Sequence, residues 1–262
     1  MKSCLKDERA AVEYDDTCAP DDADHMGSYF VIFLTLSVFL AGLFCFFPVI
    51  DLWTAARFYE HNRGFVIENT SSGRVLPFLP WLVGLFITAC LLIIAVNLAR
   101  RYFLGEKRPL VASNRVVLFL LLTLGIGPGL FVNTLLKDHS GRARPYQVSE
   151  FGGYRRFTPA FVISDQCNTN CSFVSGDASL GYFGLAFFFV TRRRRILVVS
   201  AAVLAGTLLG FVRMAQGAHF LSDVIFSGVF TFLAGWLLYF LLLRRWQSRQ
   251  AAGSNPNYEK SL

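Results

Sequence analysis

Residues 213–243 read RMAQGAHFLSDVIFSGVFTFLAGWLLYFLLL, a membrane-length apolar run whose charged side chains all lie near its beginning. A helix needs about 20 apolar residues to cross a bilayer. Working outward from this run, the chain contains six expected spans at 29–50, 78–98, 116–136, 178–190, 196–212 and 222–243. We therefore predict an all-α bundle of six transmembrane helices. The run 178–190 is short, and a buried helix that does not cross is the alternative for it.

Composition and charge place the chain in a membrane. Hydrophobic residues make up 54% of the 262, only 16% are charged, and the mean hydropathy is +0.46, which is too apolar for an ordinary soluble domain. The net charge of +7 does not indicate nucleic-acid binding, because the basic residues gather in alternate loops, around 100–115, 192–195 and 244–249. By the positive-inside rule these loops are cytoplasmic, and an even number of spans places both termini there too.

The expected organisation is one domain with two tails. Residues 1–28 and 248–262 are predicted to be cytoplasmic tails, and 29–247 to form the membrane domain. No cleavable signal precedes the first span, so we expect that span to stay as an anchor. The longest loop between spans, 137–177, is predicted to lie outside the cytoplasm and to carry the active site.

The first motif in this loop is basic. Lys137 and Arg144 are seven residues apart, about two helical turns, so both could face one phosphate. Pro145 disfavours helical geometry at Arg144, so the helix is expected to unwind there. Since Arg142 and Arg144 alternate, only one of them needs to face the site. Taken alone, the cluster is also typical of side chains that extend to lipid headgroups.

The second motif is Ser175-Gly176, directly before an apolar run. Small residues at a helix N-terminus let backbone N–H groups approach phosphate oxygens, and Ser172 or Ser175 could add a hydroxyl. A simple helix cap by Ser175 is the alternative.

The third motif joins Arg213, His219 and Asp223. Gln216-Gly217 offers a break that lets Arg213 and His219 turn toward one point. His219 and Asp223 are four residues apart, so they share a helix face if the sixth span begins near His219. Asp223 could then accept a hydrogen bond from one ring nitrogen while the other attacks phosphorus. Ionisable residues beside a bilayer are costly, which favours a functional role.

Two cysteines, Cys167 and Cys171, lie in the outer loop. In an oxidising compartment they could close a small disulfide loop beside the Ser-Gly segment. Two free thiols are equally consistent with the spacing, and no second pair of ligands indicates a zinc site.

The combination of Lys137, Arg144-Pro145, Ser175-Gly176, Arg213, His219 and Asp223 resembles the type 2 phosphatidic acid phosphatase superfamily. The strings at 125–130, 137–139 and 167–173 are similar to inner-membrane lipid A 4′-phosphatases. This resemblance implies a periplasmic active site that removes a lipid phosphate through a phosphohistidine, with no metal or cofactor. Lys137, Arg144, Ser175, Gly176 and Arg213 would then bind phosphate. His219 would attack, and Asp223 would orient it.

The second motif departs from the superfamily pattern. Asp177 stands where the superfamily usually has a histidine that protonates the leaving alcohol. A carboxyl group beside a phosphate dianion favours its protonated form, so Asp177 could donate that proton. His139 is the other candidate donor, and a third possibility is that neither acts.

The resemblance leaves the substrate open. Lipid A is the first choice, and phosphatidylglycerophosphate or a polyprenyl diphosphate is the second. Because the usual histidine is missing, a non-catalytic phospholipid-binding or transport protein is the alternative of another class. The expected partners are the bilayer and its lipids, not nucleic acid.

Overall fold

The computed structural model describes residues 21–67, 77–105, 112–191 and 194–244 and is mostly helical, as predicted. The α-helices are α1 (Asp21–Phe46), α2 (Val49–Ala56), α3 (Leu79–Phe103), α4 (Asn114–Leu124), α5 (Lys137–His139), α6 (Gly176–Tyr182), α7 (Arg195–Ala215) and α8 (Leu221–Leu238). The 3₁₀ and π segments are η2 (Gly125–Leu136), η3 (Pro145–Gln147), η4 (Ser149–Phe151), η5 (Phe183–Phe189) and η6 (Tyr239–Arg244). Two short antiparallel strands, β1 (Tyr59–Glu60) and β2 (Gly64–Phe65), pair Tyr59 with Phe65.

Five of the described helices are long and apolar enough to cross a membrane, where the sequence predicted six. They are Met26–Phe46, Leu79–Phe103, Asn114–His139, Arg195–Ala215 and Leu221–Leu243. The remaining predicted span, 178–190, is the short helix α6 followed by the 3₁₀ segment η5. Helix α1 begins at Asp21, within the predicted tail, because an apolar run marks only the part of a helix that suits hydrocarbon. The rest of the two predicted tails, 1–20 and 248–262, lies outside the described residues, as do the last residues of the predicted membrane domain, 245–247.

The first predicted span, 29–50, is broken near its end. Helix α1 stops at Phe46, and Pro48 precedes the first residue of α2. Proline has no N–H to donate and disfavours helical geometry at the residue before it, so the chain turns here. This break makes α2 a separate short helix, and α2 carries Asp51.

The third predicted span is continuous but widens into a π-helix. Pro128 lies inside η2, where it removes one helical donor, and the Asn133 side chain donates to the Pro128 carbonyl at 2.7 Å. A Cβ at Gly127 would lie 3.3 Å from Ala234, so the glycine lets this segment approach α8 closely. The π-helix ends at Leu136, directly before Lys137.

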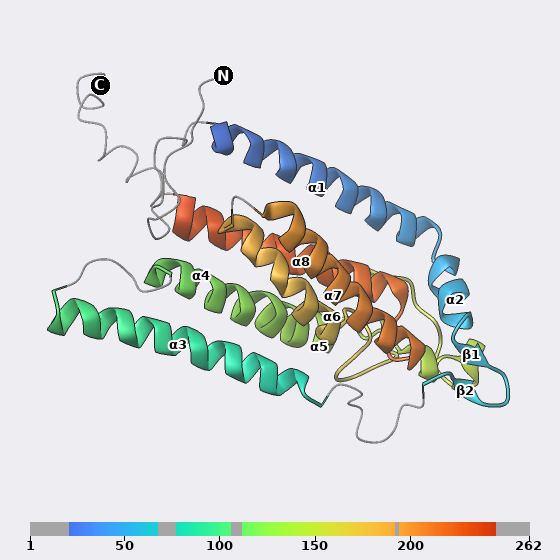
Figure 1. Ribbon diagram of the computed structural model, residues 1–262. Helices are drawn as coiled ribbons and strands as arrows, with labels where there is room; N and C mark the ends of the chain where they lie inside the picture. The colour runs from blue at the N-terminus through green and yellow to red at the C-terminus, as the bar shows by residue number, and fades with distance from the viewer. Residues whose placement is uncertain (1–20, 68–76, 106–111, 192–193, 245–262) are drawn as a thin grey trace.

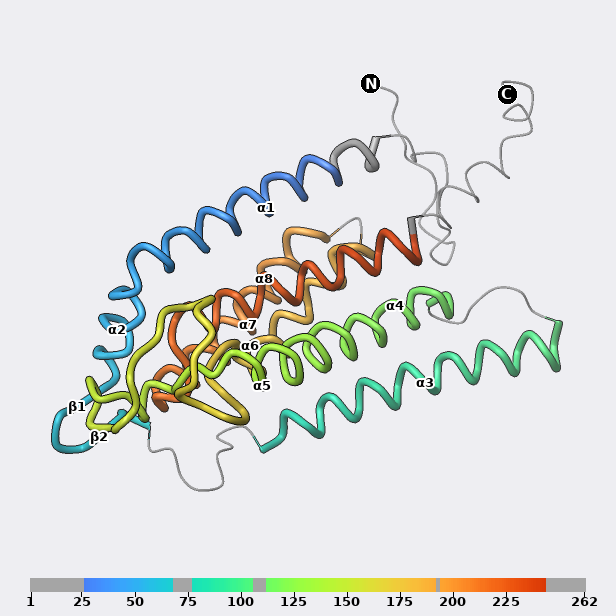
Figure 2. Tube along the Cα trace, turned by 180° about the vertical axis from the view of Figure 1, so that it is seen from behind, coloured from blue at the N-terminus to red at the C-terminus, as the bar shows by residue number. Residues whose placement is uncertain are grey.

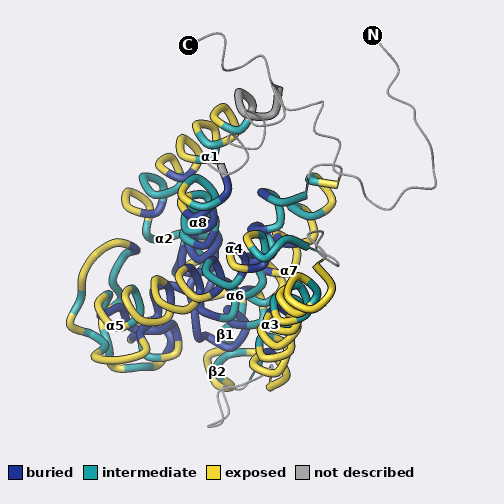
Figure 3. Tube along the Cα trace, turned by 90° about the vertical axis from the view of Figure 1, so that its left-hand side faces the viewer, coloured by how far each residue is buried: buried dark blue, intermediate teal, exposed yellow. Residues whose placement is uncertain are grey.

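Helix α8 occupies the middle of the bundle, while α1 and α3 run along opposite outer sides (Figures 1 and 2). Large apolar side chains on α1 and α3 are exposed, which suits contact with lipid, whereas much of α8 is buried (Figure 3). The beginning of α8, the end of α7 and the loop after α5 meet at the end of the bundle that also holds α2 and the two strands. The first residues of α1 and the end of η6 lie at the opposite end.

Candidate active site

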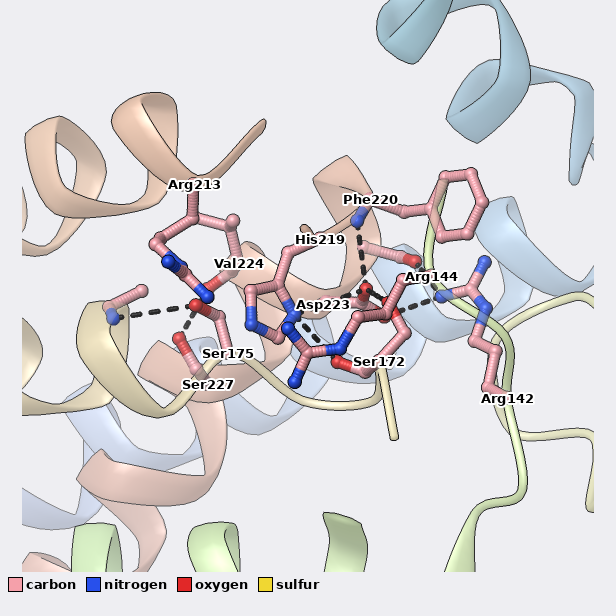
Figure 4. Close-up of polar contacts among 12 residues, drawn as sticks. Arg142, Arg144, Ser172, Ser175, Arg213, His219, Phe220, Asp223, Val224 and Ser227 are labelled. Atoms are coloured by element: carbon pink, nitrogen blue, oxygen red, sulfur yellow. Dashed lines mark hydrogen bonds and ion pairs between the residues drawn. The ribbon is translucent and has the colours of Figure 1, made fainter. Parts of the chain in front are cut away.

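The three motifs meet at this end of the bundle. Arg213 lies in the last turn of α7, His219 in the short connection after it, and Asp223 in the first turn of α8. Helix α7 ends before Gln216, and Gly217 adopts φ +65°, a left-handed conformation that turns the chain toward α8. Figure 4 shows Arg213, Arg144 and Ser172 gathered around the His219 ring. The structure therefore brings segments of all three motifs together at one end of the bundle.

His219 is held by the backbone of the second motif. Its side chain is almost fully buried, and Nδ1 lies 2.7 Å from the Ser172 carbonyl oxygen. A carbonyl can only accept, so Nδ1 carries the proton and donates to it. The lone pair of the neutral ring is then on Nε2. The tautomer needed for attack by Nε2 is thus fixed by a backbone oxygen.

The predicted hydrogen bond between His219 and Asp223 is wrong in its direct form. Asp223 Oδ2 is 3.6 Å from Nδ1, beyond hydrogen-bond distance, and the Ser172 carbonyl is the nearer acceptor. Asp223 acts instead through its neighbours, since Oδ2 accepts from Ser172 Oγ at 2.5 Å and from the Phe220 N–H at 2.8 Å. Asp223 therefore holds Ser172 in place, and the Ser172 carbonyl in turn orients the His219 ring. Asp223 also places a negative charge close to that ring.

Electrostatics favour a neutral His219. Burial lowers the pKa of its ring, and the positive charges of Arg144 and Lys137 lower it further, while Asp223 opposes them. The ring can therefore serve as a nucleophile without first losing a proton.

Arg142 and Arg144 have different surroundings. Arg142 is 1% exposed and donates to Asp223 Oδ1 at 2.5 Å and to Asp51 Oδ2 at 2.8 Å. Burial alone lowers the pKa of this guanidinium, but the two carboxylates raise it above the usual value. Arg144 donates to the backbone and side-chain oxygens of Asn170 at 2.8 and 2.9 Å, and burial together with the charge of Arg213 lowers its pKa. Of these two arginines, Arg144 is the one that lies near the cations Lys137 and Arg213.

The remaining two cations lie beside the second motif. A Cβ at Gly176 would come within 2.9 Å of Lys137 Nζ, so the absence of a side chain leaves room for the lysine. Arg213 pairs with the partly exposed Asp177, whose Oδ2 lies 3.0 Å from Nε, and donates to Gln216 at 2.8 Å. A group of three cations with one neutral imidazole suits a multiply charged anion such as phosphate.

Ser175 caps α6. Its hydroxyl accepts from the Ala178 N–H at 3.5 Å, and its own N–H donates to the Asp223 carbonyl at 3.1 Å. The side chain is fully buried. The Ser175 hydroxyl thus acts as a helix cap, which was the alternative interpretation of this motif. Gly176 lies beside Lys137.

The two candidate proton donors differ in position. Asp177 lies among the cations, whereas His139 is exposed and its Nδ1 is 2.9 Å from the Leu135 carbonyl of its own helix. His139 makes no described hydrogen bond with the residues around His219.

A disulfide joins Cys167 and Cys171, whose Cα atoms are 5.6 Å apart. Asn170, the residue that holds Arg144, lies inside this small loop. Within the described part of the chain, no group of three or more His, Cys, Asp or Glu side chains is arranged to hold a metal ion.

Sequence reasoning missed two members of the site, Asp51 and the Ser172 carbonyl. Asp51 is fully buried, and its carboxylate accepts from the N–H and hydroxyl of Ser222 at 2.8 and 2.6 Å. Burial and the charge of Asp223 raise the pKa of Asp51, and Arg142 opposes them. The available signal was a lone carboxylate at the end of an apolar run, where an ionisable residue is costly.

Comparisons with known proteins confirm the resemblance to the type 2 phosphatidic acid phosphatase (PAP2) superfamily. The model of the PAP2 superfamily matches residues 116–247. The chain is 37% identical to the lipid A 4′-phosphatase of Francisella tularensis subsp. novicida, over 83% of this chain and 97% of that protein. It is 39% identical to the lipid A 4′-phosphatase of Rhizobium leguminosarum over 49% of this chain and 54% of that protein. For the Rhizobium etli lipid A 4′-phosphatase the identity is 43%, over 38% and 39%. No solved structure matches the chain significantly.

Proposed function

Because this chain belongs to the PAP2 superfamily, we propose that it is a membrane phosphatase that hydrolyses the 4′-phosphate monoester of lipid A. The Francisella relative is covered over 97% of its length and carries the name lipid A 4′-phosphatase, which supports this substrate. The observation that carries the chemistry is His219, a buried neutral ring with Nδ1 bound to the Ser172 carbonyl and Nε2 left for attack.

In the proposed reaction, Nε2 of His219 forms a bond to phosphorus as the bond from phosphorus to the sugar oxygen breaks. Lys137, Arg144 and Arg213 hold the phosphoryl oxygens, and their fixed positive charges offset the negative charge on those oxygens in the transition state. The ring becomes positively charged, and Asp223 at 3.6 Å stabilises that charge. Water then attacks the phosphohistidine, which releases inorganic phosphate and restores His219.

Asp177 is the proposed donor of the proton to the leaving sugar oxygen. Its carboxylate pairs with Arg213, at a position that a phosphate oxygen would occupy. Substrate phosphate can therefore displace Asp177 from the arginine, and the dianion then favours the protonated carboxyl. Asp177 recovers the proton from the attacking water in the second step. His139, exposed and bonded to its own helix, is the weaker candidate.

We further propose six membrane crossings, of which α6 and η5 together form the fourth. The two segments have seven residues each, and a 3₁₀ segment rises more per residue than an α-helix, so they reach about 25 Å. That length approaches the roughly 30 Å hydrocarbon core. The basic loops then lie in the cytoplasm with both termini, and the active site faces the periplasm of a bacterial inner membrane. An oxidising periplasm is compatible with the Cys167–Cys171 disulfide.

The test is the lipid A of cells that express the protein. Mass spectrometry with fragmentation should show loss of the phosphate on the non-reducing sugar, and the His219→Ala variant should leave lipid A unchanged at equal membrane abundance. His61→Ala is the matched control, because His61 is exposed in the turn between the two strands. Unchanged lipid A with the wild-type chain, together with phosphate release from another phospholipid, would contradict the substrate. Full activity of His219→Ala would contradict the mechanism.

A further inference from the structure

Asp51 joins three parts of the site that are far apart in the sequence. Its Oδ1 accepts from the Ser222 N–H at 2.8 Å, and its Oδ2 accepts from the Ser222 hydroxyl at 2.6 Å and from Arg142 at 2.8 Å. Ser222 lies in the first turn of α8, directly before Asp223, and Arg142 lies in the outer loop. A carboxylate from α2 thus fixes both the start of α8 and the arginine that contacts Asp223.

The charges of this cluster do not cancel. Arg142 is one cation, and it donates to two carboxylates, those of Asp51 and Asp223. Its other described contacts are neutral, namely the Thr158 carbonyl, the Ser222 hydroxyl and the ring faces of Phe220 and Phe157. With both carboxylates ionised, the three groups carry one net negative charge, and all three are buried.

This surplus matters for the charge that forms on His219. If Arg142 were paired with Asp223 alone, its charge at 2.5 Å would largely cancel that of the carboxylate as seen from the ring. Asp51 shares the arginine, so the field at His219 stays negative when the ring is phosphorylated and becomes a cation. Such an interaction strengthens during the reaction and therefore acts on kcat more than on KM.

We propose that Asp51 is a positioning residue for phosphoryl transfer, which holds Arg142 and the start of α8 so that Asp223 keeps its charge for His219. This inference rests on the proposed function. It concerns a side chain outside the three motifs, on a helix that the PAP2 match, residues 116–247, does not reach.

The experiment compares three variants in the full-length detergent-solubilised protein. Asp51→Asn keeps the shape and an acceptor for the Ser222 N–H but removes the charge. The double variant Asp51→Asn/Arg142→Gln removes both charges and leaves Asp223 without an opposing arginine. Asp165→Asn is the matched control, because Asp165 is exposed and bonds only to the neighbouring Gln166 among the described side chains. The readouts are kcat, KM, inhibition by orthovanadate and thermal unfolding.

We expect Asp51→Asn to lower kcat about tenfold or more with little change in KM or vanadate inhibition, and the double variant to recover part of that loss. A purely structural role predicts that the double variant is at least as impaired as the single one. That result, or a kcat for Asp51→Asn within about twofold of wild type, would overturn the inference. If Asp51→Asn fails to fold, the double variant is compared with wild type, because both keep one net negative charge at this cluster. A kcat within about tenfold of wild type agrees with the proposal, and a larger loss contradicts it.

A second readout separates this inference from the proposed reaction. Phosphate release by the wild type and none by His219→Ala tests the reaction. If the wild type releases none, the proposed function fails, and nuclear magnetic resonance of isotope-labelled histidine still tests Asp51. The His219 ring signal, identified by its loss in His219→Ala, should shift in Asp51→Asn and return toward the wild-type position in the double variant. An unchanged signal would overturn the inference.

Discussion

The Nδ1 atom of His219 lies 2.7 Å from the Ser172 carbonyl oxygen and 3.6 Å from the Asp223 carboxylate, so the ring donates to the backbone and not to the acid. Asp223 in turn accepts from the hydroxyl of the same Ser172 at 2.5 Å. The acid and the carbonyl therefore form one unit around the ring. The carbonyl sets the tautomer, and the carboxylate supplies the charge.

The low pKa of His219 predicts how stability depends on pH. The unfolded ring takes up a proton near its usual pKa of about 6.5, whereas the buried ring does not until the pH is much lower. This group therefore has no effect on stability well above about pH 6.5, the unfolded pKa. Stability falls as the pH drops below about 6.5, because the unfolded state then binds more protons than the folded state. We expect the unfolding temperature of His219→Gln to fall less between about pH 7 and pH 5 than the unfolding temperature of the wild type. An equal or larger loss in the variant would contradict the burial argument.

Arg142 and Arg144 should fail in different ways when each is replaced by glutamine. Arg142→Gln leaves two buried carboxylates without their cation, so we expect a loss of about 3–5 kcal/mol in unfolding free energy. Among the described residues, the side-chain hydrogen bonds that Arg144→Gln breaks are those to Asn170, so the fold should persist while phosphate release falls by roughly tenfold or more. Thermal unfolding and phosphate release, measured on both variants, check this contrast. The opposite pattern would show that Arg142 is the phosphate ligand.

Much of this arrangement could be predicted from sequence, because it follows local spacing. The apolar runs located the long helices, although α1 begins at Asp21, eight residues before the run at 29–50. The four-residue spacing of His219 and Asp223 brought them near each other, and the break at Gln216-Gly217 lies where α7 ends. The short run 178–190 became an α-helix continued by a 3₁₀ segment, a change in rise that apolar composition does not encode.

The parts that sequence reasoning missed depend on groups without a local pattern. A carbonyl oxygen belongs to every residue, so nothing in the side chains distinguished Ser172 as the partner of His219. Asp51 is 171 positions from Ser222, and only the break at Pro48 and the packing of α2 against α8 bring them together. The choice between Arg142 and Arg144 likewise needed the buried carboxylates, since alternation shows only that the two differ.

Gly176 is predicted to be a spacer for Lys137. An added Cβ would collide with Asn133 Oδ1 and come within 2.9 Å of Lys137 Nζ, so the lysine must move in Gly176→Ala. We expect phosphate release to drop by about tenfold or more, with a raised concentration of vanadate needed for inhibition. Gly84→Ala is the control, because a Cβ there meets nothing within 4 Å and the added methyl group favours the helix. Normal activity of Gly176→Ala would show that Lys137 has room to adjust.

The Cys167–Cys171 disulfide is predicted to keep Arg144 in place through Asn170. Both oxygens that accept from the guanidinium belong to Asn170, which lies inside the disulfide loop. Replacing both cysteines by serine should lower phosphate release several-fold, and a reducing agent should do the same to the wild type but not to the variant. Cys45→Ser, which removes a free exposed thiol, is the control. Activity that does not respond to reduction would separate the disulfide from the site.

The role of Asp177 can be tested through the leaving group. The sugar alcohol of lipid A is a poor leaving group and needs a proton as the bond to phosphorus breaks, whereas nitrophenolate departs readily without one. Asp177→Asn should therefore slow lipid A hydrolysis by about 100-fold or more and slow p-nitrophenyl phosphate hydrolysis much less. Loss of the ion pair with Arg213 affects both substrates alike, because that arginine holds the phosphate of each. An equal loss on both substrates would show that Asp177 acts only through its ion pair with Arg213. His139 or water would then be the proton donor.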